Sequence, residues 1–412
     1  MAHDLKTSDV VTKLAVRNLK ELTPFLRNTR RPIEDVFKSP GSKPGESFRI
    51  RKPMRGIGRT GDAMSPENII QDQVTLTLDP LWGFDVEITD RQWKLEINDF
   101  DREVVQPAML SIAARMEAHY TQVATQAAFN SVGTPGTQIN NDLQYLTAGD
   151  LLTEHGAPKA NRNIFQNSRA ISALVNANKS LFHANAALEK QYRTGTVTGM
   201  AHGFNWFEST CLYNHNTGDY SSSTPLVNGA SQSGSSLITD GWGSGTTTLN
   251  KGDVFYINNV FAVTPQGRVN TGELQAFTVT TAISDTAGAI TIAISPEIKG
   301  PGDPHQNVNA LPANNAEIFF QGSTVASPVQ LNNTDSLQGL ATHEDACCIA
   351  FVPLPTHSDV AISRRSTDPD TKISVRFEQQ TEIRSGLNLA RFDVLCGMAI
   401  PYPELMVRLW GA

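Results

Sequence analysis

The stretch VTLTLDPLWGFDVEIT, residues 74–89, decides the fold, because apolar and polar residues alternate along most of its length. An alternation of period two predicts β-strands that are apolar on one face and polar on the other. We therefore expect two strands in succession in this stretch. Their apolar positions are Val74, Leu76, Leu78, Phe84, Val86 and Ile88.

The segment before this stretch supplies the partner of the first strand. Phe48 and Ile50 alternate with Arg49 and Arg51, again with a period of two. We expect a long hairpin over residues 46–78, with a tip at 54–68 that is rich in glycine and charge. A two-stranded hairpin is only marginally stable by itself, so this one must lie against another part of a protein.

Basic side chains are concentrated in the same hairpin, in FRIRKPMRGIGRTGD (residues 48–62). A nucleic-acid grip is the obvious hypothesis, but such proteins usually interleave aromatic with basic residues or place the basic residues on a helix. Here Phe48 is the only aromatic residue, and one acid, Asp62, accompanies the bases. The pattern favours a face between protein subunits over a DNA grip. The candidate residues are Arg49, Arg51, Lys52, Arg55 and Arg59.

A long helix is predicted over residues 99–129, where apolar residues recur at steps of three and four. Pro107 fits the first turn of its long part. The predicted buried stripe consists of Val105, Met109, Ile112, Met116, Tyr120, Val123 and Ala127.

The rest of the chain divides by composition. Residues 8–22 predict a helix, and residues 23–47, rich in proline and glycine, predict an extended arm that crosses a surface. In residues 221–250, 18 of 30 are Gly, Ser or Thr, which indicates a linker or a domain boundary. Short helices are expected near 146–155 and 167–178. Strands are expected at 253–263, 274–283, 289–294 and 316–321, as a small barrel or sandwich, and at 373–380 and 389–400.

Charge is distributed unevenly along the chain. Residues 1–60 contain 14 Lys and Arg against 6 Asp and Glu, out of 34 and 41 in the whole chain. The remainder therefore has 20 against 35, a balance of −15. A basic first segment on an acidic body indicates contact with a partner, either nucleic acid or the acidic face of another protein.

Membrane and secretory signals are not evident. The sequence has no run of eighteen apolar residues, and its first residues have no apolar signal-peptide core, so neither a membrane span nor secretion is expected. The four cysteines lack zinc-site spacing, and we expect them to be reduced and mostly buried. They are Cys211, Cys347, Cys348 and Cys396.

Two short motifs come near to catalytic or binding patterns. HEDAC (residues 343–347) lacks the second histidine of a zinc-protease motif, so we expect His343 and Glu344 at the surface beside buried cysteines. GWGSG (residues 241–245) lacks the strand and helix that a phosphate loop requires, and we expect a flexible linker. No catalytic, cofactor-binding or metal-binding residue is expected, and the chain is not expected to be an enzyme.

The order of these parts resembles the major coat proteins of P22-like tailed phages. SFRIRKPMRG (47–56) is similar to the strand that opens that family's hairpin. VTLTLDPLWGFDVEITDRQWKLEINDFDREVVQPAMLSIAARMEAHY (74–120) is similar to the strands and long helix that follow. KGDVFYINNVFAVTPQGRVNTGELQAFTVTT (251–281) resembles an inserted β-domain. IAFVPLPT (349–356), STDPDTKISVR (366–376) and ARFDVLCGMAIPYPEL (390–405) resemble C-terminal strands.

The resemblance implies an α+β protein with the HK97-like coat fold. In this fold the hairpin, called the E-loop, lies across the P-domain of the next subunit, so the five basic residues would face acids of a neighbour. The implied parts are an N-terminal arm (1–45), the E-loop (46–80), a P-domain with the spine helix (81–144), an A-domain (145–225), an inserted β-barrel domain (226–325), a return to the A-domain (326–365), and P-domain strands with a C-terminal A-domain segment (366–412).

The implied function is that of a major capsid protein that self-assembles into the icosahedral, T=7 head of a tailed dsDNA bacteriophage. The implied partners are further copies of the chain, in hexamers and pentamers, a scaffolding protein, a portal protein, and dsDNA that is enclosed without sequence-specific binding. The implied location is the virion, with assembly in the host cytoplasm, and no cofactor is implied. Two alternatives stay open: a non-viral compartment shell protein of the same fold, and a soluble nucleic-acid-binding protein that uses basic residues 1–60.

Overall fold

The chain forms two compact units in the computed structural model. Unit 1 comprises Met1–Arg51, Gln73–Tyr120 and Cys347–Pro401, and unit 2 comprises Lys52–Asp72, Thr121–Ala346 and Tyr402–Ala412. The structure describes residues 12–13, 15–16, 23–31, 47–56, 58, 61–64, 66, 71–89, 101–177, 200–219, 225–242, 246–285, 288–322, 333–368, 372–382 and 384–411.

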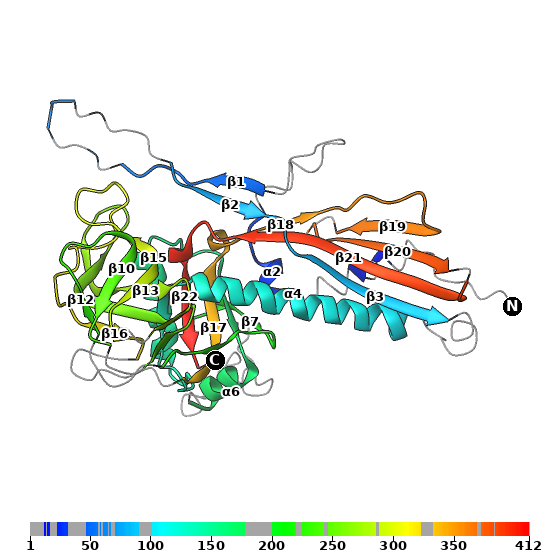
Figure 1. Ribbon diagram of the computed structural model, residues 1–412, viewed down its shortest axis with the longest axis horizontal. Coiled ribbons are helices and arrows are strands. Elements are labelled where there is room, and N and C mark those ends of the chain that lie inside the picture. The colour runs from blue at the N-terminus through cyan, green and yellow to red at the C-terminus, as the bar shows by residue number, and fades with distance from the viewer. Residues whose placement is uncertain are drawn as a thin grey trace, which may run out of the picture. The chain divides into compact units, whose positions relative to one another are not determined.

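The main sheet of unit 1 is antiparallel and is organised around one long strand, β21 (Leu387–Ala399). One half of β21 pairs with β3 (Leu81–Thr89) and the other half with β18 (Cys348–Val352). On its other side β21 pairs with β20 (Ser374–Glu382), which pairs with the edge strand β19 (Ile362–Thr367). Figure 1 shows these strands side by side. The strands predicted at 373–380 and 389–400 are therefore confirmed as β20 and β21.

The predicted long helix is α4 (Gln106–Ala127), which follows a π-helical turn, η2 (Asp101–Val105). The first five positions of the predicted stripe, from Val105 to Tyr120, are buried. The last two, Val123 and Ala127, are only half-buried. Ala124 and Ala128, each one position later, are completely buried instead. The last turns of α4 belong to unit 2, where they pack against other elements.

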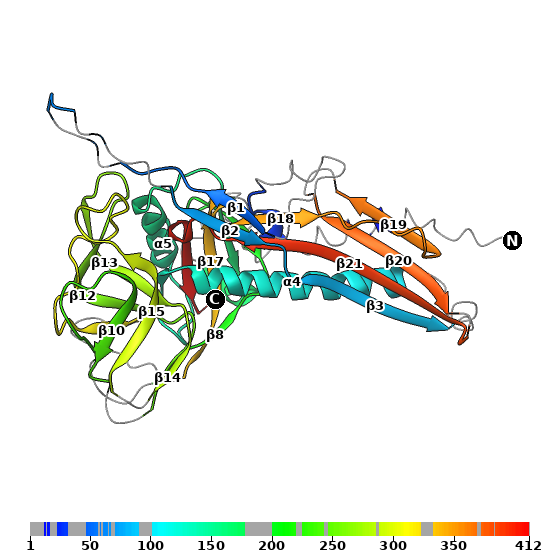
Figure 2. The same cartoon turned by 45° about the horizontal axis from the view of Figure 1, so that its top comes forward.

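Within unit 1, α4 lies along the apolar face of the sheet (Figure 2). The Tyr120 hydroxyl donates to the Cys396 carbonyl over 3.1 Å, and the Trp82 ring packs edge-on against Tyr120. Alternate residues of β21 from Ala390 to Cys396 are buried on this face. The aromatic end of the stripe thus joins the helix to the middle of the sheet.

Residues 23–31 belong to the core of unit 1. The short helix α2 (Pro24–Arg27) buries Phe25 and Leu26 almost completely. Ile349 donates a backbone hydrogen bond to the Arg30 carbonyl over 3.0 Å. The prediction that residues 23–47 only cross a surface is therefore wrong for 23–31, because two adjacent apolar side chains fill the interior. Most of the helix predicted at 8–22 lies outside the described residues; Thr12, Lys13, Ala15 and Val16 are helical.

Unit 2 contains a second, mixed sheet. Two helices, α5 (Asp142–Glu154) and α6 (Ser168–Ala177), pack on it through Tyr145, Leu152 and Leu174, which confirms the two helices predicted there. In spatial order its strands are β4 (Asn130–Val132), β22 (Met406–Trp410), β17 (Asp335–His343), β5 (Arg162–Gln166), β7 (Phe204–Glu208) and β6 (Met200–Ala201), with β8 (Asn214–Asn216) also paired to β17.

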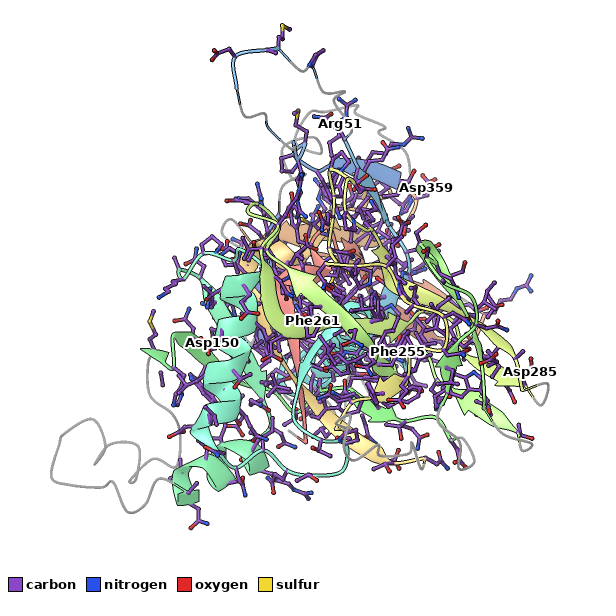
Figure 3. The ribbon with its side chains drawn as sticks, turned by 90° about the vertical axis from the view of Figure 1, so that its left-hand side faces the viewer. Arg51, Asp150, Phe255, Phe261, Asp285 and Asp359 are labelled. Carbon is purple, nitrogen blue, oxygen red and sulfur yellow. The ribbon has the colours of Figure 1, made fainter. Side chains whose placement is uncertain are left out.

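The third sheet is antiparallel and closes on itself. In spatial order its strands are β16 (Ile318–Phe320), β12 (Val254–Val263), β13 (Asn270–Val279), β15 (Ile290–Ile298), β10 (Gly234–Asp240) and β9 (Leu226–Val227). A bridge from Leu226 to Glu317 joins the two outermost strands, so the sheet surrounds its core. Phe255, labelled in Figure 3, stacks on Phe277 inside it. Two short strands, β11 (Thr247–Leu249) and β14 (Ile283–Asp285), pair antiparallel with each other as a separate two-stranded sheet.

The Gly/Ser/Thr-rich stretch contributes to this closed sheet. β10 lies within it, and Trp242 of GWGSG is completely buried in the sheet's core. The Trp242 indole N–H donates to the Thr239 hydroxyl over 2.8 Å. The prediction of a flexible linker is therefore wrong for Trp242, since a buried indole with a hydrogen-bond partner fixes the backbone around it. Residues 243–245 lie outside the described residues.

Candidate subunit interface

The predicted hairpin pairs β1 (Ser47–Arg51) with β2 (Gln73–Thr77). The register places Phe48 opposite Leu76 and Ile50 opposite Val74, so the apolar residues share one face. This face packs against Ala350 of β18 and Ala399 of β21 within unit 1. The requirement that the hairpin lie on another surface is thus met, at this end, by the chain itself.

One glycine allows this close approach. A Cβ atom added at Gly397 would lie 2.0 Å from the carbonyl oxygen of Thr77. The atoms nearest to this added Cβ belong to the backbone of Thr77 and Leu78, so no flexible side chain can move aside to make room. Strand β2 therefore crosses β21 at a position where only glycine fits.

The opposite face of the hairpin is exposed and basic. Arg49 and Arg51 lie on it with Gln73, Thr75 and Thr77 opposite or beside them. Among the residues that the structure describes, neither arginine has an acidic partner. Figure 3 labels Arg51 where the hairpin leaves the rest of unit 1.

Two other predicted site residues contact their own chain. Arg55 makes a 3.0 Å ion pair with Glu404, and the Lys52 ammonium lies 5.6 Å from the ring centre of Tyr402. All four residues belong to unit 2. The five basic residues predicted as one group therefore divide. Arg49 and Arg51 have no acidic partner in the part of the chain that the structure describes, and Lys52 and Arg55 contact Tyr402 and Glu404. Arg59 lies outside the described residues.

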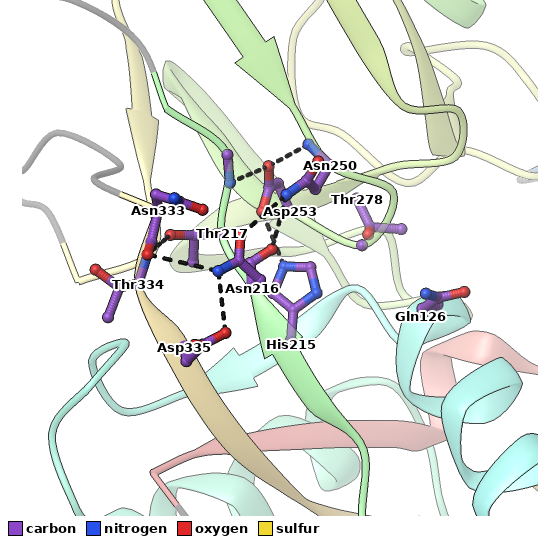
Figure 4. A network of polar contacts seen from close by, with 12 residues as sticks. Gln126, His215, Asn216, Thr217, Asn250, Asp253, Thr278, Asn333, Thr334 and Asp335 are labelled. Atoms are coloured by element: carbon purple, nitrogen blue, oxygen red, sulfur yellow. Dashed lines mark hydrogen bonds and ion pairs between the residues drawn. The ribbon is translucent and has the colours of Figure 1, made fainter.

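Unit 2 also contains a buried polar cluster that the sequence did not reveal (Figure 4). His215 and Asp253 are both completely buried, and His215 Nε2 lies 2.8 Å from Asp253 Oδ1. The second carboxylate oxygen accepts from the backbone N–H groups of Gly218 (3.1 Å) and Asn250 (2.7 Å). One carboxylate thus ties together β8, the turn after it and the turn before β12.

Arg408 of β22 is the other charged centre of this region. Its guanidinium is completely buried and donates to the carbonyls of Ala128 (2.7 Å) and Gln126 (3.3 Å), at the end of α4. It also donates to the Gly252 carbonyl and, over 3.0 Å, to the Thr278 hydroxyl. Burial lowers the pKa of Arg408 to about 10, while the negative charge of Asp253 opposes this shift. The arginine therefore caps the helix and joins it to the closed sheet.

Unit 1 has a comparable buried charge. Glu117 of α4 is 1% exposed and accepts from the backbone N–H groups of Phe25 (2.7 Å) and Leu26 (3.4 Å). Burial raises the pKa of Glu117 to about 7, against the two backbone hydrogen bonds, which lower it. The partners are about ninety residues apart in the chain, so no local pattern could have indicated this contact.

The HEDAC motif is structural, although one part of the prediction was wrong. Cys347 and Cys348 are buried as expected, but His343 is also buried, at 5% exposure, because it ends the central strand β17. None of the four cysteines, all of which the structure describes, forms a disulfide. Across the described ranges no three His, Cys, Asp or Glu side chains gather as a metal site would require, and no helix is long and apolar enough to cross a membrane.

Buried charged side chains thus connect distant segments inside each unit, and the hairpin has an exposed basic face. The family model of the P22 coat protein (gene protein 5) matches residues 60–411, and the chain belongs to this family. It is a major capsid protein of a tailed bacteriophage, and capsids are built from many such subunits.

Solved structures of phage capsids resemble the chain at low identity. A structure from Mycobacterium phage Che8 is 11% identical, with 94% of this chain and 90% of that chain covered and a TM-score of 0.48. The capsid structure of the cyanophage P-SCSP1u is 12% identical, with 94% and 86% covered and a TM-score of 0.47. The CUS-3 coat protein I-domain is 27% identical, with 25% and 99% covered and a TM-score of 0.20. No curated protein matches the chain.

Proposed function

We propose that this capsid protein has the HK97-like coat fold and that its copies assemble, as hexamers and pentamers, into an icosahedral T=7 shell around dsDNA. Membership of the P22 coat protein family is the observation that carries this proposal. The proposed role of the protein is purely structural, without catalysis. A scaffolding protein and a portal protein are the further partners proposed, with assembly in the host cytoplasm.

The proposed division of the chain follows the coat fold. Residues 1–45 form the N-terminal segment, in which residues 23–31 pack into the core of their own subunit. Residues 46–80 form the E-loop, 81–144 the P-domain with α4 as its spine helix, and 145–225 the A-domain. Residues 226–325 form an inserted β-barrel domain, 326–365 return to the A-domain, and 366–412 complete the P-domain and A-domain. The closed six-stranded sheet and its own apolar core support the inserted domain.

The proposed contact between subunits uses the exposed face of the hairpin. Arg49 and Arg51, with Arg59, would meet acids on the sheet of a neighbouring copy. We assign these acids to Glu87 and Asp85 of β3, which are exposed and lie on the same sheet face. Asp85 lies opposite Arg391, which already binds Asp393, and Glu87 lies opposite the exposed Leu389. Glu87 is therefore the acid with more capacity to accept an arginine.

Electron microscopy of the expressed protein tests the assembly itself. Closed shells of uniform size are expected, with a scaffolding protein supplied where the chain alone gives irregular particles. A protein that stays a dispersed subunit under both conditions would contradict the proposal. Shells that load a peptide-tagged cargo protein in place of DNA would instead favour the non-viral compartment.

Charge reversal tests the contact. The double variant Arg49→Glu/Arg51→Glu should give far fewer shells and an unchanged far-UV circular dichroism spectrum. Adding Asp85→Lys/Glu87→Lys in the same chain should restore part of the yield. Lys159→Glu/Lys251→Glu is the matched control, because both lysines are exposed and the net charge changes equally. If the double variant assembles normally but loses tight DNA binding in a retardation assay, the hairpin binds nucleic acid instead.

A further inference from the structure

The tip of the hairpin contacts its own chain on both sides. We call residues 52–56 its first leg and residues 71–72 its second leg. The legs meet where the Lys52 N–H donates to the Asp72 carbonyl over 2.8 Å, one residue beyond the last pair of β1 and β2. Beyond this point, Lys52–Asp72 belong to unit 2. Within unit 2 they contact two separate places.

The first place is the segment Tyr402–Glu404, at the start of the short helix η5 (Pro403–Leu405). Lys52 lies over the Tyr402 ring at 5.6 Å, a distance at which a cation is attracted to the ring face. Arg55 pairs with Glu404 at 3.0 Å, and the two side chains are 36% and 19% exposed. Two basic residues on one leg thus meet one aromatic ring and one carboxylate two residues apart.

The second place consists of two loops of the closed sheet. Arg268 donates to the carbonyls of Gly56 and Pro304, each over 3.2 Å, so one guanidinium joins the first leg to the loop of Pro304. His305, in that same loop, lies 3.8 Å from the carboxylate of Asp72 on the second leg. Both legs are therefore engaged.

The surface that receives the legs is held firmly by other contacts. Asn130, 4% exposed, donates to the Glu404 carbonyl over 3.2 Å, and its side-chain oxygen lies 3.1 Å from His155 Nε2. The Tyr402 N–H donates to the Ala346 carbonyl over 3.4 Å. In the loop, the His305 N–H donates to Asp303 over 2.7 Å. The receiving residues thus keep their positions independently of the hairpin.

We propose that Tyr402, Glu404, Arg268 and His305 form an intrachain docking surface, the hairpin latch, which holds the legs of the tip before any neighbour is present. Lys52 and Arg55 then stabilise the hairpin of their own subunit, and Arg49 and Arg51 are left for another copy. A single exposed pair contributes little. Four contacts on two legs that are already paired act together, because fixing one leg removes most of the freedom of the other. The assignment of Arg49 and Arg51 rests on the proposed function; the latch does not.

Zero-length chemical coupling tests the latch in the unassembled subunit. Arg55→Lys keeps the charge and places an amine near Glu404, and a carbodiimide then joins this amine to the carboxylate. The expected product is a pair of peptides coupled between positions 55 and 404, found by mass spectrometry in a band that still migrates as a single chain. Arg51→Lys is the matched control, and should give no coupled pair at position 51. A pair found only in bands of two or more chains, or no pair at position 55, would overturn the latch.

Charge exchange gives an independent readout. Hydrogen exchange of the peptide that spans residues 52–72 should be several-fold faster in Arg55→Glu or Glu404→Arg subunits, and should return to the wild-type rate in the double variant. A mixture of the two single variants should stay fast, since each chain has lost its own contact. Recovery in the mixture would assign the contact to two chains and overturn the latch. These measurements need no shells, so a failure to assemble contradicts the proposed function and leaves the latch to be decided by its own result.

Discussion

The Glu117 carboxylate accepts a 2.7 Å hydrogen bond from the backbone N–H of Phe25, which joins the long helix to a segment about ninety residues earlier in the chain. The carboxylate is buried, and burial raises its pKa from 4.5 to about 7. This contact therefore links the packing of residues 23–31 to pH.

The sign of the effect follows from proton uptake. Between about pH 4.5 and pH 7 the folded chain holds a proton on Glu117 that the unfolded chain has lost, so the free energy of unfolding contributed by this group decreases as the pH rises through this range. The shift corresponds to about 3 kcal/mol at most. In Glu117→Gln this dependence should vanish. Urea midpoints at about pH 5 and pH 8 check it, and an equal pH dependence in both proteins would contradict it.

Replacing Phe25 should unfold unit 1 more easily. The side chain is 1% exposed, and truncating a buried phenylalanine to alanine typically costs about 3–5 kcal/mol. We expect a clearly lower thermal midpoint for Phe25→Ala, while Arg27→Ala, at an exposed position of the same helix, should stay close to wild type. Removing residues 1–31 should behave like Phe25→Ala or worse. A well-folded subunit without residues 1–31 would show that these residues are an arm after all.

Arg408 should be hard to replace. Arg408→Met leaves the carbonyls of Ala128, Gln126 and Gly252 without their donor and Asp253 without a nearby positive charge. Breaking a buried charged network in this way typically costs about 3–5 kcal/mol. Arg408→Lys keeps the charge but has fewer hydrogen-bond donors, so its free energy of unfolding should lie between those of the wild type and Arg408→Met. Urea unfolding of the three proteins checks this order, which equal stability of the methionine and lysine variants would contradict.

Gly397→Ala should displace the hairpin. The new methyl group would lie 2.0 Å from the Thr77 carbonyl oxygen, and overpacking of this kind typically costs about 1–3 kcal/mol. Faster hydrogen exchange in β1 and β2 is the expected local signature. Gly149→Ala is the control, because its nearest neighbour, a Phe204 ring atom, would be 3.6 Å away and the residue is helical. Unchanged exchange in the hairpin of Gly397→Ala would contradict the close crossing.

The alternation of residues predicted the hairpin and its two faces because one face is buried and the other is not. Phe48 and Ile50 could be assigned from their period alone, and the helix stripe up to Tyr120 likewise. At the end of the helix, different neighbours cover a different face, so the buried positions moved from Val123 to Ala124. A pattern within one element cannot report which element covers it.

The buried charges could not be predicted for a related reason. Glu117, Asp253 and Arg408 are satisfied by backbone groups between 3 and 282 residues away, and the distant ones supply most of the contacts. Composition misled as well: Trp242 stands among small polar residues, yet it lies in a core to which Leu237 of β10 also contributes. Small polar residues are thus compatible with a strand when a single inward side chain reaches the core, because strand propensity depends strongly on packing against neighbours.

The closure of the six-stranded sheet brings together the points where the chain enters and leaves it. The Ile318 N–H donates to the Pro225 carbonyl over 2.9 Å, and Leu226 bridges Glu317. Residues more than ninety positions apart in the sequence are thus adjacent, so the closed sheet begins and ends at the same place in unit 2. A foreign domain whose own termini meet could replace the closed sheet between these points without stretching the chain, so every subunit of a shell could carry one inserted enzyme or antigen.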